Sequence, residues 1–188
     1  RAMRAGSSLG PPDALIGVLR ARGEKVAVIA VDPTSPFTGG SLLGDRIRMS
    51  HLLEDEKVFM RSMATRGTMG GISRTTQDAA DVLDAAGFTT ILIETVGLGQ
   101  SEVEIARATD CTVVILSPES GDGIQAMKSG LMEIADIVLI NKADRIGADK
   151  MEHSLRSAFE LKPVQKHEIG ILLAEAFRAK GIPELLAA

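Results

Sequence analysis

The chain has 188 residues, of which 45% are hydrophobic and 24% charged, so it is long enough for an α/β domain with a buried core and lacks a disordered composition. Aromatic residues make up only 3% and the net charge is −4, which excludes an aromatic stacking platform and a chain-wide basic surface for nucleic acid. The single cysteine, Cys111, cannot form an internal disulfide, and no apolar run reaches the roughly 18 residues of a membrane span. We therefore expect a soluble cytoplasmic protein that binds neither nucleic acid nor a membrane.

Short runs of aliphatic and β-branched residues alternate along the chain with segments of helical periodicity. The runs predict strands that are buried on both faces, as in a parallel sheet covered by helices. The expected strands are, in chain order, 25–31, 58–63, 89–94, 111–117 and 137–141. The expected helices are 13–22, 75–86, 100–108, 123–135 and 148–160. This alternation predicts a doubly wound, mainly parallel α/β sheet with helices on both faces, in a single domain, with ligands at the carboxyl ends of the strands.

An irregular segment rich in proline, glycine and hydroxyl groups follows the first expected strand and runs to Arg46. Its acids are Asp32 and Asp45, and acidic groups on such a loop suit a hard, oxygen-liganded cation such as Mg²⁺. A structural role fits the same residues, because Asp32 can cap a turn and Asp45 can cap a helix over 46–53. Both interpretations stay open on these residues alone.

The next buried strand ends in the acid Glu94, and Gly97 follows three residues later. This is the spacing of the Walker B and switch II element of GTPases, in which the acid positions Mg²⁺ and the glycine N–H meets the γ-phosphate. A strand end followed by a flexible glycine turn fits equally. Gln100 stands three residues after Gly97, whereas a water-orienting glutamine usually follows that glycine directly. If Gln100 is catalytic we expect slow or partner-dependent hydrolysis, and a helix start is its other interpretation.

The tetrapeptide Asn141-Lys142-Ala143-Asp144 closes another buried strand. An NKxD sequence in this position of a GTPase reads guanine. The aspartate accepts hydrogen bonds from N1–H and N2–H, the lysine stem packs on the ring, and the asparagine ties loops together. Adenine offers no matching pair of donors and would leave the carboxylate unpaired. Because this motif follows a parallel strand, 47 residues beyond Glu94, it predicts a guanine-nucleotide fold.

Together these motifs resemble the MeaB/ArgK family of P-loop GTPases. The similar strings are VDPTSPFTGGSLLGDRIRM (31–49), RGTMGGISRTT (66–76), ETVGLGQSE (94–102), SGDGIQAMKSG (120–130) and NKAD (141–144). The resemblance implies a homodimeric GTPase with a P-loop NTPase (G-domain) fold in the cytoplasm or mitochondrial matrix. GTP binding and hydrolysis would gate adenosylcobalamin loading and protection of methylmalonyl-CoA mutase or a related acyl-CoA mutase. The older ArgK description, an amino-acid transport ATPase or kinase, fits less well because NKAD specifies guanine.

The resemblance also implies a role for individual residues. The implied Mg²⁺ ligands are Asp32, Asp45 and Glu94, and the implied catalytic residues are Glu94, Gly97 and Gln100. The implied guanine-binding residues are Asn141, Lys142 and Asp144, with Glu175 and Ala176 in a second loop that backs the base. The implied switch segment, 120–130, would relay the nucleotide state to the mutase through Gly121, Asp122, Gln125 and Lys128. For Lys128 a solvated helix face fits equally well.

The phosphate cradle of a P-loop GTPase, G-x-x-x-x-G-K-[ST], is missing from this sequence. The family reads GPPGxGKSTLxDALI, whereas here Gly10-Pro11-Pro12 is followed at once by Asp13, a loss of about eight residues. Either a disordered loop is omitted from a continuously numbered chain, or the protein has no functional cradle. We favour the omission, which predicts that Pro12 and Asp13 are not covalently joined. The alternative predicts a module that binds a protein partner without hydrolysing nucleotide. The family's helical extensions are also largely absent, so dimerisation rests on the resemblance alone.

Overall fold

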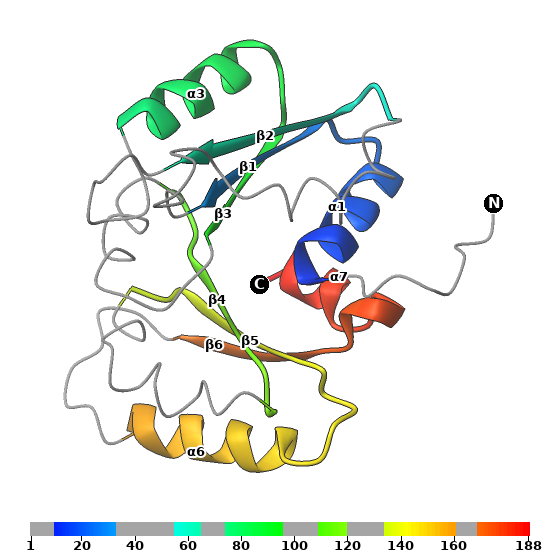
Figure 1. Ribbon diagram of the computed structural model, residues 1–188. Coiled ribbons are helices and arrows are strands. Elements are labelled where there is room, and N and C mark those ends of the chain that lie inside the picture. Colours follow the sequence, from blue (N-terminus) through cyan, green and yellow to red (C-terminus); the bar gives the residue numbers. More distant parts are fainter. Residues whose placement is uncertain (1–9, 33–54, 65–73, 96–108, 120–133, 161–168) are drawn as a thin grey trace, which may run out of the picture. The chain divides into compact units, whose positions relative to one another are not determined.

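The computed structural model describes residues 10–32, 55–64, 74–95, 109–119, 134–160 and 169–188. The chain divides into two compact units, Arg1–Gly97 and Leu98–Ala188, and each contains its own three-stranded sheet (Figure 1). Every pairing between these strands is parallel, as the buried aliphatic runs predicted. None of the described helices is long and apolar enough to cross a membrane.

The first unit contains two helices and three strands in its described part. They are α1 (Pro11–Ala21), β1 (Val26–Asp32), β2 (Val58–Ala64), α3 (Arg74–Ala85) and β3 (Thr90–Thr95). The strand order is β2-β1-β3, so β1 is central and pairs on both edges. Because side chains alternate along a strand, Ala27, Ile29 and Val31 share one face of the sheet, where they pack with Leu83 of α3. Figure 1 shows α3 on one side of this sheet and α1 on the other.

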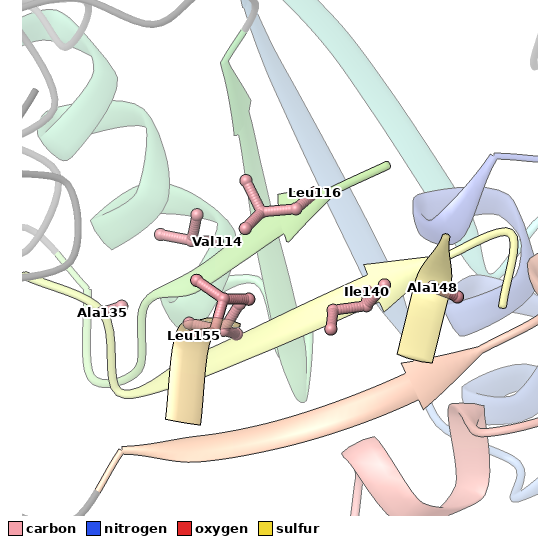
Figure 2. Packing of buried hydrophobic residues seen from close by; sticks show 7 residues of the cluster. Val114, Leu116, Ala135, Ile140, Ala148 and Leu155 are labelled. Atoms are coloured by element: carbon pink, nitrogen blue, oxygen red, sulfur yellow. The ribbon is translucent and has the colours of Figure 1, made fainter. Parts of the chain in front are cut away.

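The second unit repeats the pattern of a parallel sheet with attached helices. Its elements are β4 (Val113–Leu116), β5 (Ile137–Asn141), α6 (Ala148–Glu160), β6 (Gly170–Ala174), the 3₁₀ turn η4 (Ala176–Arg178) and α7 (Ile182–Leu185). The strand order is β4-β5-β6. Val114, Leu116 and Ile140 of the sheet pack with Ala148 and Leu155 of α6 (Figure 2). Burying a large aliphatic side chain stabilises a fold by about 1.5–3 kcal/mol, so this cluster holds α6 on the sheet.

The sequence located most of these elements, and the α/β fold class with parallel strands is confirmed. β5 and α6 have the expected bounds, and the other expected elements that are described differ by no more than two residues at either end. The strand β6 was not expected. The helix predicted at 100–108 lies outside the described residues. Of the helix predicted at 123–135, only Ile134 and Ala135 are described, and neither is helical.

Pro12 and Asp13 lie in the first turn of α1, and the omission of a loop between them stays a prediction. Gly10 precedes the helix with an extended backbone, and its N–H donates to Asp13 Oδ2 at 3.0 Å. Pro11 and Pro12 occupy the first helical positions, where an N–H would have no partner within the helix. The sequence Gly-Pro-Pro-Asp therefore forms a capped helix start at the place where the resemblance located the phosphate cradle.

Candidate functional site

The candidate site for the guanine base lies at the carboxyl end of β5, in the second unit. Asn141 is the last residue of β5 and is in register with Ala174, the last residue of β6. Lys142 follows with a φ of 57°, a left-handed conformation that is uncommon outside glycine, so the chain turns sharply as it leaves the sheet. The Ala143 N–H then donates to the Ala174 carbonyl at 3.0 Å. This turn places residues 141–144 beside the end of β6.

A side chain joins this loop to the loop that follows β6. The Ala176 N–H donates to Asn141 Oδ1 at 3.1 Å, and Ala176 is only 3% exposed. The motif predicted that Asn141 ties loops together, and the resemblance implied that Ala176 belongs to a second base-binding segment. The structure brings these two residues into direct contact, while their role toward a nucleotide stays a prediction.

Asp144, the residue expected to read the base, is partly open to solvent. Its side chain is 30% exposed, and its Oδ2 lies 3.7 Å from Arg145 Nε. A carboxylate has about four lone-pair directions on two oxygens, so it can accept two donors from a ligand and still lie near a guanidinium. The residues present therefore fit a guanine base, since Asp144 offers a carboxylate for its N–H groups.

The structure adds Glu119, which the sequence analysis did not single out. Lys142 Nζ donates to Glu119 Oε2 at 2.8 Å, and Arg145 Nε lies 3.7 Å from Glu119 Oε1. The hydrogen bond and charge of Lys142 lower the pKa of the Glu119 carboxyl, and the charge of Arg145 adds to this. Both partners of the Lys142 pair are about half exposed, so the pair contributes little to folding stability but directs the Lys142 side chain. The only signal in the sequence is an acid shortly after a strand that neighbours β5.

Both carboxylate oxygens of Glu175, which the resemblance assigned to the nucleotide, are engaged within the chain. Oε1 accepts from Lys180 Nζ at 2.7 Å, and Oε2 accepts from Arg178 Nη1 at 2.8 Å. The hydrogen bond from Lys180 lowers the pKa of Glu175 most, that from Arg178 also lowers it, and burial opposes both. The Glu175 side chain is 7% exposed, so its carboxylate forms part of the turn after β6.

The acids expected to surround Mg²⁺ belong to the first unit where they are described. Asp32 is the last residue of β1, and Glu94 of β3 is in register with Ala30. The two acids therefore lie on neighbouring strands, two positions apart in register. Among the described residues no three His, Cys, Asp or Glu side chains group as metal ligands, so the Mg²⁺ site stays a prediction. The predicted residues outside the described part are Asp45, Gly97, Gln100, Gly121, Asp122, Gln125 and Lys128.

The fold is similar to that of two solved structures of proteins named HypB. HypB from Helicobacter pylori in complex with nickel matches with a TM-score of 0.63 at 18% identity, over 95% of this chain and 80% of that chain. The hydrogenase maturation factor HypB from Archaeoglobus fulgidus matches with a TM-score of 0.62 at 19% identity, over 93% and 81% of the two chains. At these identities the likeness concerns the fold alone, an α/β fold with parallel strands.

The chain belongs to the family described as methylmalonyl-CoA mutase-associated GTPase MeaB, which matches residues 6–188. A putative GTPase of Pyrococcus horikoshii is 50% identical in an alignment 188 positions long that covers 94% of this chain. GTPase ArgK of Escherichia coli is 40% identical over 168 residues (87% of this chain), and the mouse mitochondrial methylmalonic aciduria type A homolog is 46% identical over 127 (68%). The chain spans 59%, 51% and 31% of the lengths of these three relatives. The family resemblance in the sequence is thus confirmed.

Proposed function

We propose that this chain binds guanine nucleotides and hydrolyses GTP. The observation that carries the proposal is the hydrogen bond from the Ala176 N–H to Asn141 Oδ1, because it joins the two loops that were each expected to hold the base. Asp144 supports the choice of guanine, since its oxygens can accept the N1–H and N2–H donors. Adenine would leave those acceptors unpaired.

Membership of a GTPase family supports phosphate and Mg²⁺ binding as well. We assign Mg²⁺ to Asp32, Asp45 and Glu94, directly or through water, and contact with the γ-phosphate to Gly97. Bound Mg²⁺ would neutralise charge on the phosphate oxygens. Gln100 is the candidate for orienting water, and its distance in sequence from Gly97 supports slow or partner-dependent hydrolysis.

We assign to the chain a role as a chaperone of an adenosylcobalamin-dependent acyl-CoA mutase, such as methylmalonyl-CoA mutase, whose cofactor loading its nucleotide state gates. The family's description as mutase-associated and the name of the mouse relative support this partner. The proposed relay runs through the switch residues Gly121, Asp122, Gln125 and Lys128. The proposal includes a homodimer in the cytoplasm. An ArgK-type transport ATPase or kinase has less support, because Asp144 favours guanine.

One observation favours a second candidate, a guanine-binding module that contacts a protein partner without hydrolysing nucleotide. At the start of α1, the Asp13 carboxylate accepts the Gly10 N–H at 3.0 Å. A phosphate cradle needs free backbone N–H groups and a lysine, whereas this turn offers a carboxylate. Such a module would bind the base, and the phosphates would add little to its affinity.

Isothermal titration calorimetry of the full chain with GTP, GDP, guanosine and ATP, with and without Mg²⁺, tests both candidates. The first candidate predicts that GTP and GDP bind much more tightly than guanosine, that Mg²⁺ strengthens GTP binding, and that phosphate is released from GTP. The second predicts similar affinities for guanosine and GTP and no phosphate release. ATP bound as tightly as GTP would overturn both. Asp144→Ala should weaken the binding of every guanine ligand. The matched control is Asp149→Ala, on the exposed start of α6.

A further inference from the structure

The turn after β4 lies beside the loop after β5 in the second unit. β4 and β5 are parallel, with Leu116 in register with Ile140, so both strands end at the same edge of the sheet. A Cβ atom at Gly147 would lie 3.8 Å from Pro118 Cβ, so the two segments stay close beyond Asp144. A side chain on the turn after β4 can therefore act on the loop that holds Asp144.

Asp144 has a cation on each side of it in the chain, Lys142 two residues before and Arg145 directly after. The Arg145 N–H donates to the Lys142 carbonyl at 2.9 Å, so a closed turn keeps both residues near Asp144. A guanidinium pairs strongly with a carboxylate through two parallel N–H donors. Such a pair would occupy the edge of the Asp144 carboxylate that would otherwise accept N1–H and N2–H of guanine. Arg145 is therefore a cation that could compete with the base.

In the structure both cations are shared with a second acid, Glu119. Lys142 Nζ donates to Glu119 Oε2 at 2.8 Å, and Arg145 Nε lies 3.7 Å from Oε1 of the same carboxylate. Arg145 Nε also lies 3.7 Å from Asp144 Oδ2, which is too far for a hydrogen bond. The Asp144 side chain is 30% exposed, so a ligand can reach it. Arg145 thus stands between two carboxylates instead of closing on Asp144.

The place of Arg145 between the two acids depends on the charge of Glu119. At equal distances two carboxylates attract a cation about equally, and removal of one charge leaves the other to draw the cation in. The Arg145 side chain is 59% exposed and has room to move. Lys142 holds Oε2 of Glu119, which directs Oε1 toward Arg145. The contacts are exposed and contribute little to folding, so the charge of Glu119 can be removed without loss of the fold.

We propose that Glu119 is a positioning residue, which holds Arg145 away from Asp144 and so keeps the base-reading carboxylate open for guanine. This inference rests on the proposed function, because it needs Asp144 to accept the N–H groups of the base. Glu119 does not contact the base in this role. It acts through Arg145, while Lys142 fixes its carboxylate from the other side.

The affinity of the full chain for GDP, measured by isothermal titration calorimetry, tests this role. Glu119→Gln keeps the size of the side chain and one acceptor oxygen, and removes its charge. We expect it to bind GDP roughly 2–5-fold more weakly than the wild type, within the range that an exposed ion pair contributes. The difference from the wild type should shrink at high salt, which screens such a pair. A difference that is as large in 1 M salt, where screening acts over about 3 Å, would contradict the mechanism.

A second substitution separates this role from a merely structural one. Arg145→Met removes the competing cation, keeps an unbranched side chain, and should bind GDP at least as tightly as the wild type. Adding Arg145→Met to Glu119→Gln should restore the affinity to that of Arg145→Met alone, because Glu119 acts only through Arg145. If Glu119→Gln distorted the loop instead, the second substitution would not restore binding.

Another Glu–Arg pair of the same unit supplies the matched controls. Glu152 and Arg156 of α6 lie 2.8 Å apart, and their pair is also on the surface of the unit. Glu152→Gln, alone or together with Arg156→Met, should leave the affinity for GDP unchanged. A loss of affinity in these controls equal to that of Glu119→Gln would overturn the inference, because the effect would then follow from net charge alone.

The outcomes separate this inference from the proposed function. If the wild-type chain does not prefer GDP to ADP, the proposed function and the inference both fail. If it does, but Glu119→Gln binds GDP as tightly as the wild type, only the inference is overturned. The inference is also overturned if Glu119→Gln binds GDP more weakly and Arg145→Met does not restore the affinity. A loss that Arg145→Met reverses, with unchanged controls, supports it.

Discussion

The hydrogen bond between the two base loops gives the sharpest prediction for stability. Asn141→Ala removes the oxygen that accepts the Ala176 N–H at 3.1 Å. Because Ala176 is 3% exposed, its amide would be left buried without that acceptor. A buried donor that loses its partner costs about 1–3 kcal/mol. On a chain of this size the same loss lowers Tm by about 2–12 °C.

The measurement is urea unfolding of the full chain, followed by circular dichroism, with Tm as a second readout. The midpoint should fall in Asn141→Ala while the dependence of the unfolding free energy on urea is unchanged, which marks a change in stability alone. Asn141→Asp is the matched control, since it keeps an acceptor oxygen at the same position and should recover most of the lost stability. An Asn141→Ala protein within about 0.5 kcal/mol of the wild type, the usual range for neutral surface changes, would refute the reasoning.

Three further predictions follow from single sites. Gly181→Ala should lower Tm more than Gly23→Ala, because both glycines have a positive φ but only at Gly181 would the new Cβ meet backbone, at 2.1 Å; equal losses would contradict this. Asp144→Ala should weaken GDP binding by at least roughly 5-fold, as expected for loss of a carboxylate acceptor, and leave the urea midpoint unchanged; unaltered titration would contradict it. The hydrogen bond from Arg20 lowers the pKa of Asp55, so its stabilisation should be present above about pH 4 and lost as the pH falls through the lowered pKa. The gap in urea midpoint between wild type and Asp55→Asn should therefore close in acid, and a gap that persists at pH 2 would contradict the pairing.

The sequence predicted β5 to the residue and missed β6, and the difference has a physical cause. The run Ile137–Asn141 is four buried aliphatic residues closed by an amide, which reads as a strand with a polar end. Gly170–Ala174 begins with a glycine and carries only three large aliphatic residues. Its residues do not alternate regularly between buried and exposed positions. β6 is a strand because β5 pairs with it along its whole length, and a partner 30 or more residues away in the chain leaves no local signal.

The candidate base site was predictable in its motif and not in its supporting contacts. The motif Asn141-Lys142-Ala143-Asp144 carries its own chemistry, so residue types alone suggested a guanine loop. Glu119 acquires its role only because β4 and β5 are parallel neighbours whose carboxyl ends meet, which brings its carboxylate 2.8 Å from Lys142 Nζ. For Glu175 the resemblance suggested a ligand, whereas the fold surrounds it with cations from its own turn. Such assignments depend on which strands pair and where turns close, and neither is written locally in the sequence.

The helix start at Gly10 and Asp13 affects how a measured affinity for a nucleotide is interpreted. A site for a guanine nucleotide needs hydrogen-bond acceptors and a donor for the base. It also needs positive charge and free backbone N–H groups for the phosphates. The turn at the start of α1 is poorly suited to bind phosphate, because the Gly10 N–H already donates to the Asp13 carboxylate at 3.0 Å. That carboxylate would also repel phosphate. Asp13→Ala frees this N–H and removes the negative charge. If phosphates approach α1, the variant should bind GDP more tightly relative to guanosine, and if they do not, the ratio of the two affinities should stay at its wild-type value.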